Sequence, residues 1–377
     1  MMTRKMKGGI LGIVAAGALL SPTLVSAHPA PETSAASSAA PTSQVVVHTV
    51  KAAAQKAARA YWTKERMASA KPMRMAPRTV SDEEGLDAAA TAGDPGAVPP
   101  VSKTGKTADL SLVPTGAETP STQGFAYPFP FTRTAVSPVS DYNHSARRVN
   151  GKIFFVQNGG NFVCSGTVVV STNRNEVWTA GHCLSDGTQT FNSSTIFVPA
   201  YNGNSSTPAP FGQWTATQLV VASEWHNSGN LKRDLGAFNV APINGIQIQN
   251  RVGAAGFAWN QSRNQQFTDL AYPAGAPFNG TSMQLCMAAY GAADTAIGGS
   301  GPAPTGIGCD MTGGSSGGSW QIGWGGSSGA SPGLINGHND YKYTSSQPLA
   351  MYSPYFDTLA NTVRCAIQPR GSTGCPA

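Results

Sequence analysis

The stretch CDMTGGSSGGSW, Cys309–Trp320, places two adjacent serines between two pairs of glycines. Either serine fits a Gly-x-Ser-x-Gly frame, in which the glycines let the chain turn sharply and leave room beside the hydroxyl. Turn residues precede the stretch and no helical period follows it, whereas the serine of an α/β-hydrolase stands between a strand and a helix. The stretch therefore predicts a nucleophilic serine on another fold, if a histidine and a carboxylate complete the site.

His182 is the candidate base. It stands in TAGHC after an apolar run, and only His226 and His338 follow it. Asp234 is the best carboxylate to orient it, because it opens the alternating segment DLGAFNVA; the competitor, Asp186, lies in a polar turn. The resulting chain order, His–Asp–Ser, is that of chymotrypsin and differs from the order in subtilisins and α/β-hydrolases.

TAGHC, Asp234 in RDLGAF and GGSSGGSW together resemble the chymotrypsin-fold serine peptidases, and CSGTVVVSTNRNEVWTAGHC is similar to their first disulfide loop. The segment DLAYPAG resembles the secreted bacterial branch that includes the glutamyl endopeptidases. The resemblance covers roughly residues 149–363. It implies two packed six-stranded antiparallel β-barrels and peptide hydrolysis through a Ser-His-Asp triad and an acyl-enzyme, without a cofactor or a metal.

The family motif, Gly-Asp-Ser-Gly-Gly, aligns Ser316 with the nucleophile and Ser315 with the aspartate. The backbone N–H groups of Gly314 and Ser316 would then form the oxyanion hole. In the trypsin-like branch that aspartate receives the new N-terminal amine after activation, which a serine cannot do. Arg148–Gly151 (RVNG) resembles an activation site, yet its electrostatic partner is missing.

The substrate pocket is less defined. Asp310 lies six residues before Ser316, a spacing that in trypsin favours Lys or Arg in the substrate but that also occurs in glutamyl endopeptidases. The histidine of the glutamate-specific enzymes aligns with Ile335 or, after a shift, with His338. We expect Asn336, Gly337 and His338 to line the cleft and pair with substrate backbone, although packing is the alternative for His338 and also for His226.

Short strands broken by Gly, Asn, Ser and Pro recur from about residue 147 onward, which predicts an all-β barrel or sandwich. One helix is expected near the C-terminus, capped by Ser353 and Pro354. We assign residues 141–377 to the serine peptidase domain.

The first 140 residues read as a leader. Residues 1–27 have the basic start, apolar run and small-residue cleavage site of a signal peptide, and the run is too short to span a membrane. Residues 28–140 are expected to be a prosegment and low-complexity linker, with a simple linker as the alternative. One island, Lys51–Ala70, has helix-forming composition, and the rest lacks the large apolar residues of a core.

Six cysteines, an even number in an exported chain, indicate disulfides rather than metal ligands. Of the possible pairings we favour neighbours: Cys164–Cys183, Cys286–Cys309 and Cys365–Cys375. Residues 1–148 hold 16 of the 25 Lys and Arg and 10 of the 19 Asp and Glu, so the whole net charge of +6 lies in the leader. A neutral body disfavours nucleic-acid binding.

These features predict a secreted, extracellular, monomeric serine endopeptidase that acts on protein or peptide substrates, made as a preproprotein. One alternative is a lipase or esterase that uses the Gly-x-Ser-x-Gly serine with His338 as base. The other is a catalytically inactive protease fold kept as a binding module.

Overall fold

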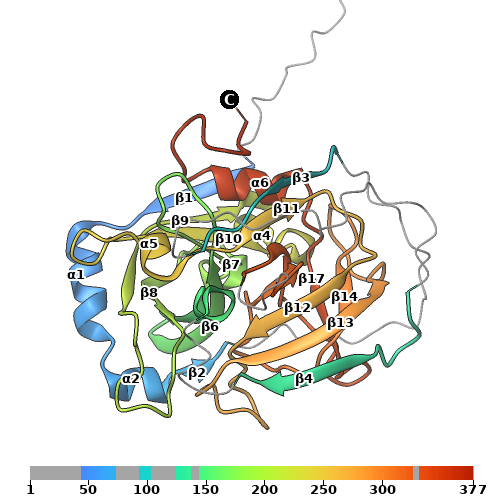
Figure 1. Cartoon of the computed structure of the whole chain (residues 1–377), viewed down its shortest axis with the longest axis horizontal. Helices are drawn as coiled ribbons and strands as arrows, with labels where there is room; N and C mark the ends of the chain where they lie inside the picture. The colour runs from blue at the N-terminus through green and yellow to red at the C-terminus, as the bar shows by residue number, and fades with distance from the viewer. Residues whose placement is uncertain (1–43, 74–92, 103–123, 137–143, 326–330, 377) are drawn as a thin grey trace, which may run out of the picture. The chain divides into compact units, whose positions relative to one another are not determined.

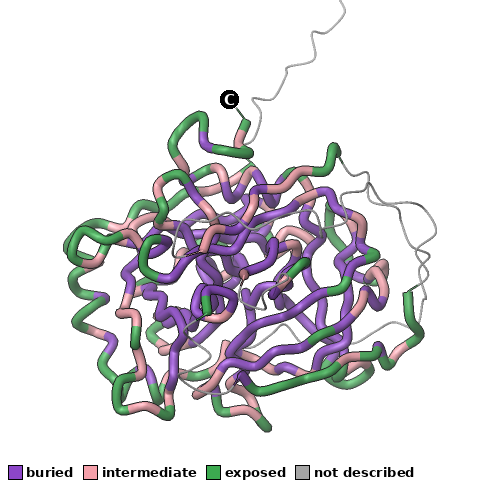
Figure 2. The backbone as a smooth tube through the Cα atoms, in the orientation of Figure 1, coloured by how far each residue is buried: buried purple, intermediate pink, exposed green. Residues whose placement is uncertain are grey.

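The chain from residue 150 onward forms two β-sheets (Figure 1). The computed structural model describes residues 44–73, 93–102, 124–136, 144–325 and 331–376. The predicted signal peptide, residues 1–27, lies outside these ranges. Buried residues concentrate along the strands of both sheets, and exposed residues along the connections (Figure 2).

The first sheet contains a closed antiparallel barrel. Its six strands are β5 (Asn150–Gln157), β6 (Gly160–Val168), β7 (Glu176–Ala180), β8 (Ser193–Pro199), β9 (Trp214–Ala222) and β10 (Leu235–Val240). The β8–β9 pairing closes the barrel, because it joins the two ends of the path β9-β10-β7-β6-β5-β8. Phe155, Phe197 and Phe238 fill the interior and are fully buried.

In the second sheet, an isolated bridge links the segment after β16 to the end strand β17. Its strands are β12 (Gln266–Ala271), β13 (Gln284–Ala293), β14 (Thr305–Gly308), β15 (Ser319–Ile322), β16 (Leu334–His338) and β17 (Ala350–Ser353). An antiparallel bridge between Tyr341 and Tyr352 returns the chain after β16 to β17. The predicted all-β fold is confirmed; of the two expected six-stranded barrels, the first is closed, and the second is represented by this sheet. β11 (Gly256–Trp259) extends this sheet by pairing parallel to β16.

Helices are few and short in the part of the chain that the structure describes. They are α3 (Ser145–Arg148), α4 (Ser223–Ser228), α5 (Ile248–Val252) and α6 (Thr358–Cys365) in the body, with two further helices in the leader. The expected C-terminal helix exists, but its predicted start is wrong. Ser353 belongs to β17, where it pairs with Thr305, and the side chain of Asp357 caps the helix by accepting from the N–H of Leu359.

The leader contributes strands to both sheets and two helices beside them. They are β1 (Val45–Thr49), α1 (Ala52–Tyr61), α2 (Lys64–Ser69), β2 (Lys71–Pro72), β3 (Gly96–Val98) and β4 (Phe131–Ala135). β1 pairs with β9, β2 with β6, β3 with β11 and β4 with β13. The helical island is confirmed. β3 lies in the part of the leader expected to bury no core, yet it pairs with β11 and its Val98 is buried, because free strand edges of the body supply the backbone partners.

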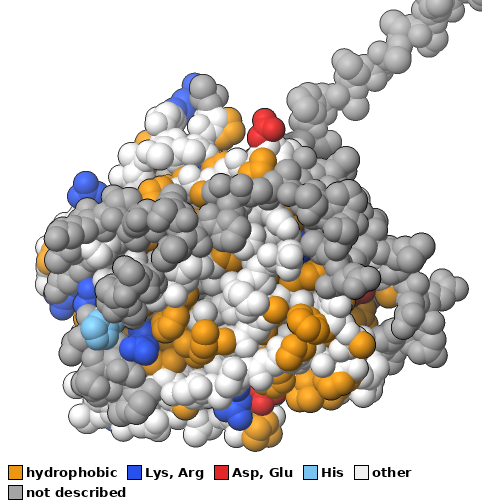
Figure 3. Space-filling model, turned by 45° about the vertical axis from the view of Figure 1, so that its right-hand side comes forward, with side chains coloured by type: hydrophobic (Ala, Val, Ile, Leu, Met, Phe, Trp, Pro, Cys, Tyr) orange, Lys and Arg blue, Asp and Glu red, His pale blue; other side chains and the backbone are white. Residues whose placement is uncertain are grey.

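The structure forms three disulfides, and their partners match the expected neighbour pairing: Cys164–Cys183, Cys286–Cys309 and Cys365–Cys375. A search of the described helices finds none with the length and apolar character needed to span a membrane. Charged residues make up 12% of the sequence, and on the face in Figure 3 the charged side chains are scattered among apolar and neutral ones.

Candidate active site

Two neighbouring strands of the first barrel bring His182 and Asp234 together. His182 lies in the 3-10 turn η2 (Gly181–Cys183) that follows β7, and Asp234 directly precedes β10. Because Leu235 pairs with Ala180 across the antiparallel strands, the two side chains meet at one end of the barrel. His182 Nδ1 lies 2.6 Å from Asp234 Oδ2, and the backbone N–H of His182 donates to Oδ1 at 2.7 Å. The carboxylate thus holds both the backbone and the ring of His182.

The negative charge of Asp234 is the main electrostatic influence on His182. Burial by itself lowers the pKa of His182, but the charge and hydrogen bond of Asp234 oppose it, and the pKa is raised to about 10. Burial opposes the charged form of Asp234, yet the His182 imidazolium keeps the pKa of that carboxyl below its usual range. The pair is therefore arranged to stabilise a positive charge on the imidazole.

The serine stretch forms a tight loop between β14 and β15, fixed against the first barrel. The N–H of Ser165 donates to Ser316 O at 2.7 Å, and Ser316 O lies 3.7 Å from Cys183 Sγ. Gly317 has φ of 76°, and a Cβ there would lie 2.0 Å from Thr179 Oγ1, so both conformation and close approach require glycine. These contacts place Ser316 beside the turn that carries His182.

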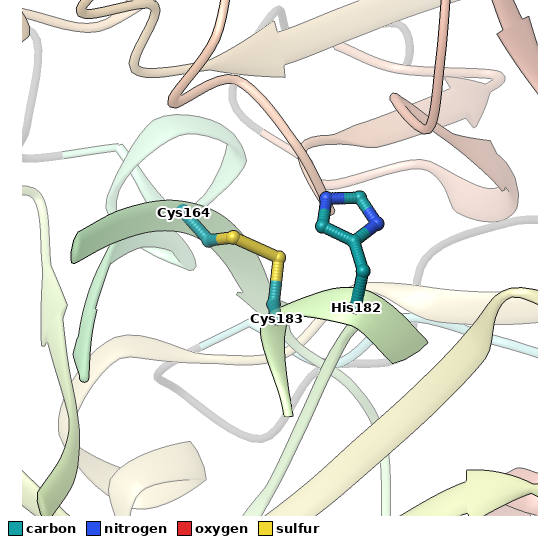
Figure 4. Close-up of side chains that lie close together, drawn as sticks. All are labelled: Cys164, His182 and Cys183. Carbon is teal, nitrogen blue, oxygen red and sulfur yellow. A yellow bond between two sulfur atoms is a disulfide. The ribbon is translucent and has the colours of Figure 1, made fainter. Parts of the chain in front are cut away.

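Two side-chain atoms of this candidate site are unpaired. Ser316 Oγ and His182 Nε2 are both buried without a hydrogen-bond partner, so the two atoms make no hydrogen bond with each other here. Among the described residues, no acceptor is recorded for the N–H of Gly314 or of Ser316. Figure 4 shows the imidazole and Cys183 projecting from the same short turn, with Cys183 bonded to Cys164. Catalytic hydrogen bonds are often long before substrate binds, so the absence of this bond does not exclude Ser316 and His182 as a catalytic pair.

Solved structures of serine proteases resemble this chain, while no family model and no curated protein matches it. A thermostable serine protease from an extremophilic microorganism is 38% identical over 58% of this chain and 96% of its own, with a TM-score of 0.52. The chain belongs to the chymotrypsin-fold serine proteases. A protease from Arthrobacter nicotinovorans is 35% identical over 62% of this chain and 97% of its own, with a TM-score of 0.52.

A structure of a Glu endopeptidase also matches, at 17% identity over 62% of this protease and 95% of its own chain, with a TM-score of 0.46. At that distance the likeness says nothing about the side chain that this protease recognises.

Asp310, the candidate pocket carboxylate, pairs with one cation and lies near a second. Nε of Arg133, on the leader strand β4, lies 2.9 Å from its carboxylate. Lys342 Nζ donates to Met311 O at 2.8 Å from the other side. Burial lowers the pKa of Lys342 to about 8, against the opposing charges of Asp310 and Asp269. The sequence offered no signal for either cation, because both partners are distant in the chain.

The other pocket candidates make contacts within this protease: Asn336 is half-buried, and Gly337 and His338 are buried. The Nδ2 of Asn336 donates to Ala258 O on β11, and a Cβ on Gly337 would lie 2.9 Å from the Trp320 ring. The ring of His338 is fully buried, and its Nδ1 accepts from Trp178 Nε1 at 3.1 Å. This placement speaks for the packing interpretation of His338 and against a role in the pocket or as the base of a lipase.

The structure also shows the surroundings of the alternative candidate residues. Asp186 Oδ1 accepts from the N–H groups of Thr188 and Thr190, so the carboxylate stabilises its own loop rather than His182. His226 Nδ1 lies 2.7 Å from Ser185 Oγ, as a packing residue would. Ser315 is fully buried and its N–H donates to Thr312 O.

One acidic residue of the site was missed. Asp340, two residues beyond β16, lies with Oδ1 3.5 Å from His182 Nδ1 and is 1% exposed. Its only sequence signal is position, since Asn339-Asp340 directly follows β16, the strand that pairs antiparallel to β15.

In the described part of the protease, three groups of His, Cys or acidic side chains could be considered as metal sites, because their ligand atoms lie within 4.8 Å of one another. Two of them depend on disulfide cysteines, whose sulfurs cannot act as thiolates: Cys164 and Cys183 with His182, and Cys286 and Cys309 with Asp269. The third is His182 with Asp234 and Asp340, where the ring nitrogen and Asp234 are already engaged with each other.

Proposed function

We propose that this chain is a secreted serine endopeptidase, made as a preproprotein, with Ser316 as nucleophile, His182 as general base and Asp234 as the orienting carboxylate. The observation that carries the proposal is the 2.6 Å contact between His182 Nδ1 and Asp234 Oδ2, with Nε2 left free beside the serine loop. That is the division of roles in a Ser-His-Asp site.

The chemistry follows from these positions. Ser316 Oγ bonds to the carbonyl carbon of the substrate while His182 Nε2 takes its proton. The negative oxygen that results accepts hydrogen bonds from the N–H groups of Gly314 and Ser316, each worth about 3 kcal/mol. The imidazolium then gives the proton to the leaving amine, and water releases the acyl group by the same steps in reverse. Asp234 stabilises the imidazolium between these transfers.

Contacts between the leader and the body support the proposal of a zymogen. β2 pairs parallel with β6 immediately before Cys164, and Met73 N–H donates to Val163 O at 3.1 Å. The carbonyl oxygen of Met73 lies 2.6 Å from the position that a Cβ on Gly313 would take. Since Gly314 directly follows Gly313, the leader lies against the oxyanion hole. Its removal would open this side of the cleft.

A second leader contact reaches the candidate pocket. Arg133 is on β4, whose partner in the ladder is β13 at Cys286. Its guanidinium forms an ion pair with the carboxylate of Asp310, to which a substrate cation would otherwise bind. We infer that the leader covers both the oxyanion side and the pocket side until it is removed.

Labelling with a fluorophosphonate tests the proposal. Processed protein should carry the label on Ser316, the label should be lost in His182→Ala, and Asp186→Asn should label like the wild type. Label on Ser315, or loss of label in His338→Ala alone, would overturn the assignment, and absence of label on folded, processed protein would favour a binding module. The unprocessed chain should label more slowly than the processed one; equal rates would refute the blocking role of the leader.

A further inference from the structure

A second buried carboxyl group accompanies the His182–Asp234 pair. Asp340 is 1% exposed, and neither of its carboxylate oxygens has a hydrogen-bond partner with normal geometry. Two polar groups of the same site lie close to it: His182 Nδ1 is 3.5 Å from Oδ1, and the carboxylates of Asp234 and Asp340 fall within 4.8 Å. A buried charge without partners would be costly, so the protonation state of this group matters.

The backbone holds Asp340 firmly in this place. Its N–H donates to Tyr352 O on β17 at 3.0 Å. The preceding residue, Asn339, accepts from the N–H of Gly317 at 2.7 Å and donates to Gly318 O at 2.9 Å. The short segment Asn339–Asp340 is therefore hydrogen-bonded to the serine loop, and it places the carboxyl group of Asp340 beside Asp234.

Two carboxyl groups this close and this deeply buried do not both ionise. Asp234 is the one that keeps the charge, because it accepts from the backbone N–H of His182 as well as from the ring. Burial, and next the charge of Asp234, raise the pKa of Asp340 far above its usual range. The other titratable groups around it are His182, His338, whose burial lowers its pKa to about 3, and Tyr341, whose pKa burial raises. None of them offers Asp340 a second positive charge.

We propose that Asp340 is a positioning residue: a neutral carboxylic acid whose O–H donates to Asp234 and so holds that carboxylate in line with His182 Nδ1. Its proton stays in place through the reaction and is not passed on. The proposal rests on the proposed role of Asp234, and it explains why a second carboxyl group is tolerated beside a base that must carry a positive charge.

Replacement of Asp340 separates its hydrogen bond from its charge. Asp340→Ala removes the donor, and we expect the rate constant for labelling of Ser316 and kcat to fall about 10- to 100-fold, the range for one lost hydrogen bond to a charged group, with KM little changed. Asp340→Asn is uncharged and keeps an N–H donor, so it should recover most of that loss. The acid limb of its pH–rate profile should coincide with that of the wild type. Asp186→Asn removes a carboxylate near His182 in sequence and serves as the matched control.

The outcomes discriminate between the possibilities. If Asp340→Asn lowers the pKa of the acid limb by a full unit, Asp340 is ionised and acts by its charge, and the proposal is wrong. If Asp340→Ala labels as fast as the wild type, the residue positions nothing. Should the alanine variant fail to fold, as judged by its thermal unfolding, the asparagine profile still decides. Failure of the proposed function is distinct, because Ser316 of the wild-type protein would then not label at all.

Discussion

Trp62→Ala should free the leader helices from the first barrel while the barrel stays folded. Trp62 is 2% exposed, its Nε1 donates to Ser194 O at 2.6 Å, and its ring centre lies 5.5 Å from that of Phe154 on β5. Truncating a buried tryptophan to alanine costs about 3–5 kcal/mol. Since each 1.4 kcal/mol is a factor of ten, local opening of α1 and α2 should increase about 150- to 4,000-fold.

Native-state hydrogen exchange measures this opening. Ser316→Ala would be placed in every sample to prevent self-cleavage, and Lys56→Ala, an exposed change on the same helix, would serve as the control. Amides of residues 52–69 should lose protection in Trp62→Ala alone, and those of β5, β6 and β7 should keep it. A change below tenfold in the helices, or equal loss in the barrel strands, would refute the reasoning that the leader is a separately docked unit held by this tryptophan.

Three further predictions concern pH and processing. A general base must be unprotonated, so the raised pKa of His182 predicts that kcat/KM climbs with pH along a limb whose apparent pKa exceeds 6.5; an ordinary histidine limb in the pH–rate profile would contradict it. Burial raises the pKa of Glu176 to about 8, so its ionisation weakens the fold progressively as pH rises from about 4.5 to 8. Glu176→Gln should therefore raise Tm relative to the wild type more at pH 9 than at pH 4, and a difference independent of pH would count against this. Arg148 is buried and its Nε donates to Val252 O, so a protease should not reach the Arg148–Val149 peptide bond. N-terminal sequencing of the mature protein should therefore find a start before Val149, whereas a start at Val149 would show that this peptide bond becomes accessible.

Motifs that are local in the chain were readable without the structure. TAGHC and GGSSGG each place a reactive residue and its turn within a few positions, and the order of His182, Asp234 and Ser316 distinguishes one protease class from others. Neighbour pairing of the cysteines also succeeded, because short loops bring such residues together at small entropic cost. Helical composition of residues 51–70 predicted α1 and α2 for the same local reason.

What the sequence by itself determined was the protease family, the candidate triad and the all-β class. Only the tertiary structure decided what surrounds those residues. Asp340 reaches His182 from 158 positions away, and Arg133 reaches Asp310 from 177 away, through strand pairings that no local pattern specifies. The sequence of the leader likewise has few large apolar residues with which to form a core. Backbone pairing with exposed strand edges, however, requires no apolar side chain. Electrostatic surroundings and edge pairing depend on distance in space, which a linear sequence records only indirectly.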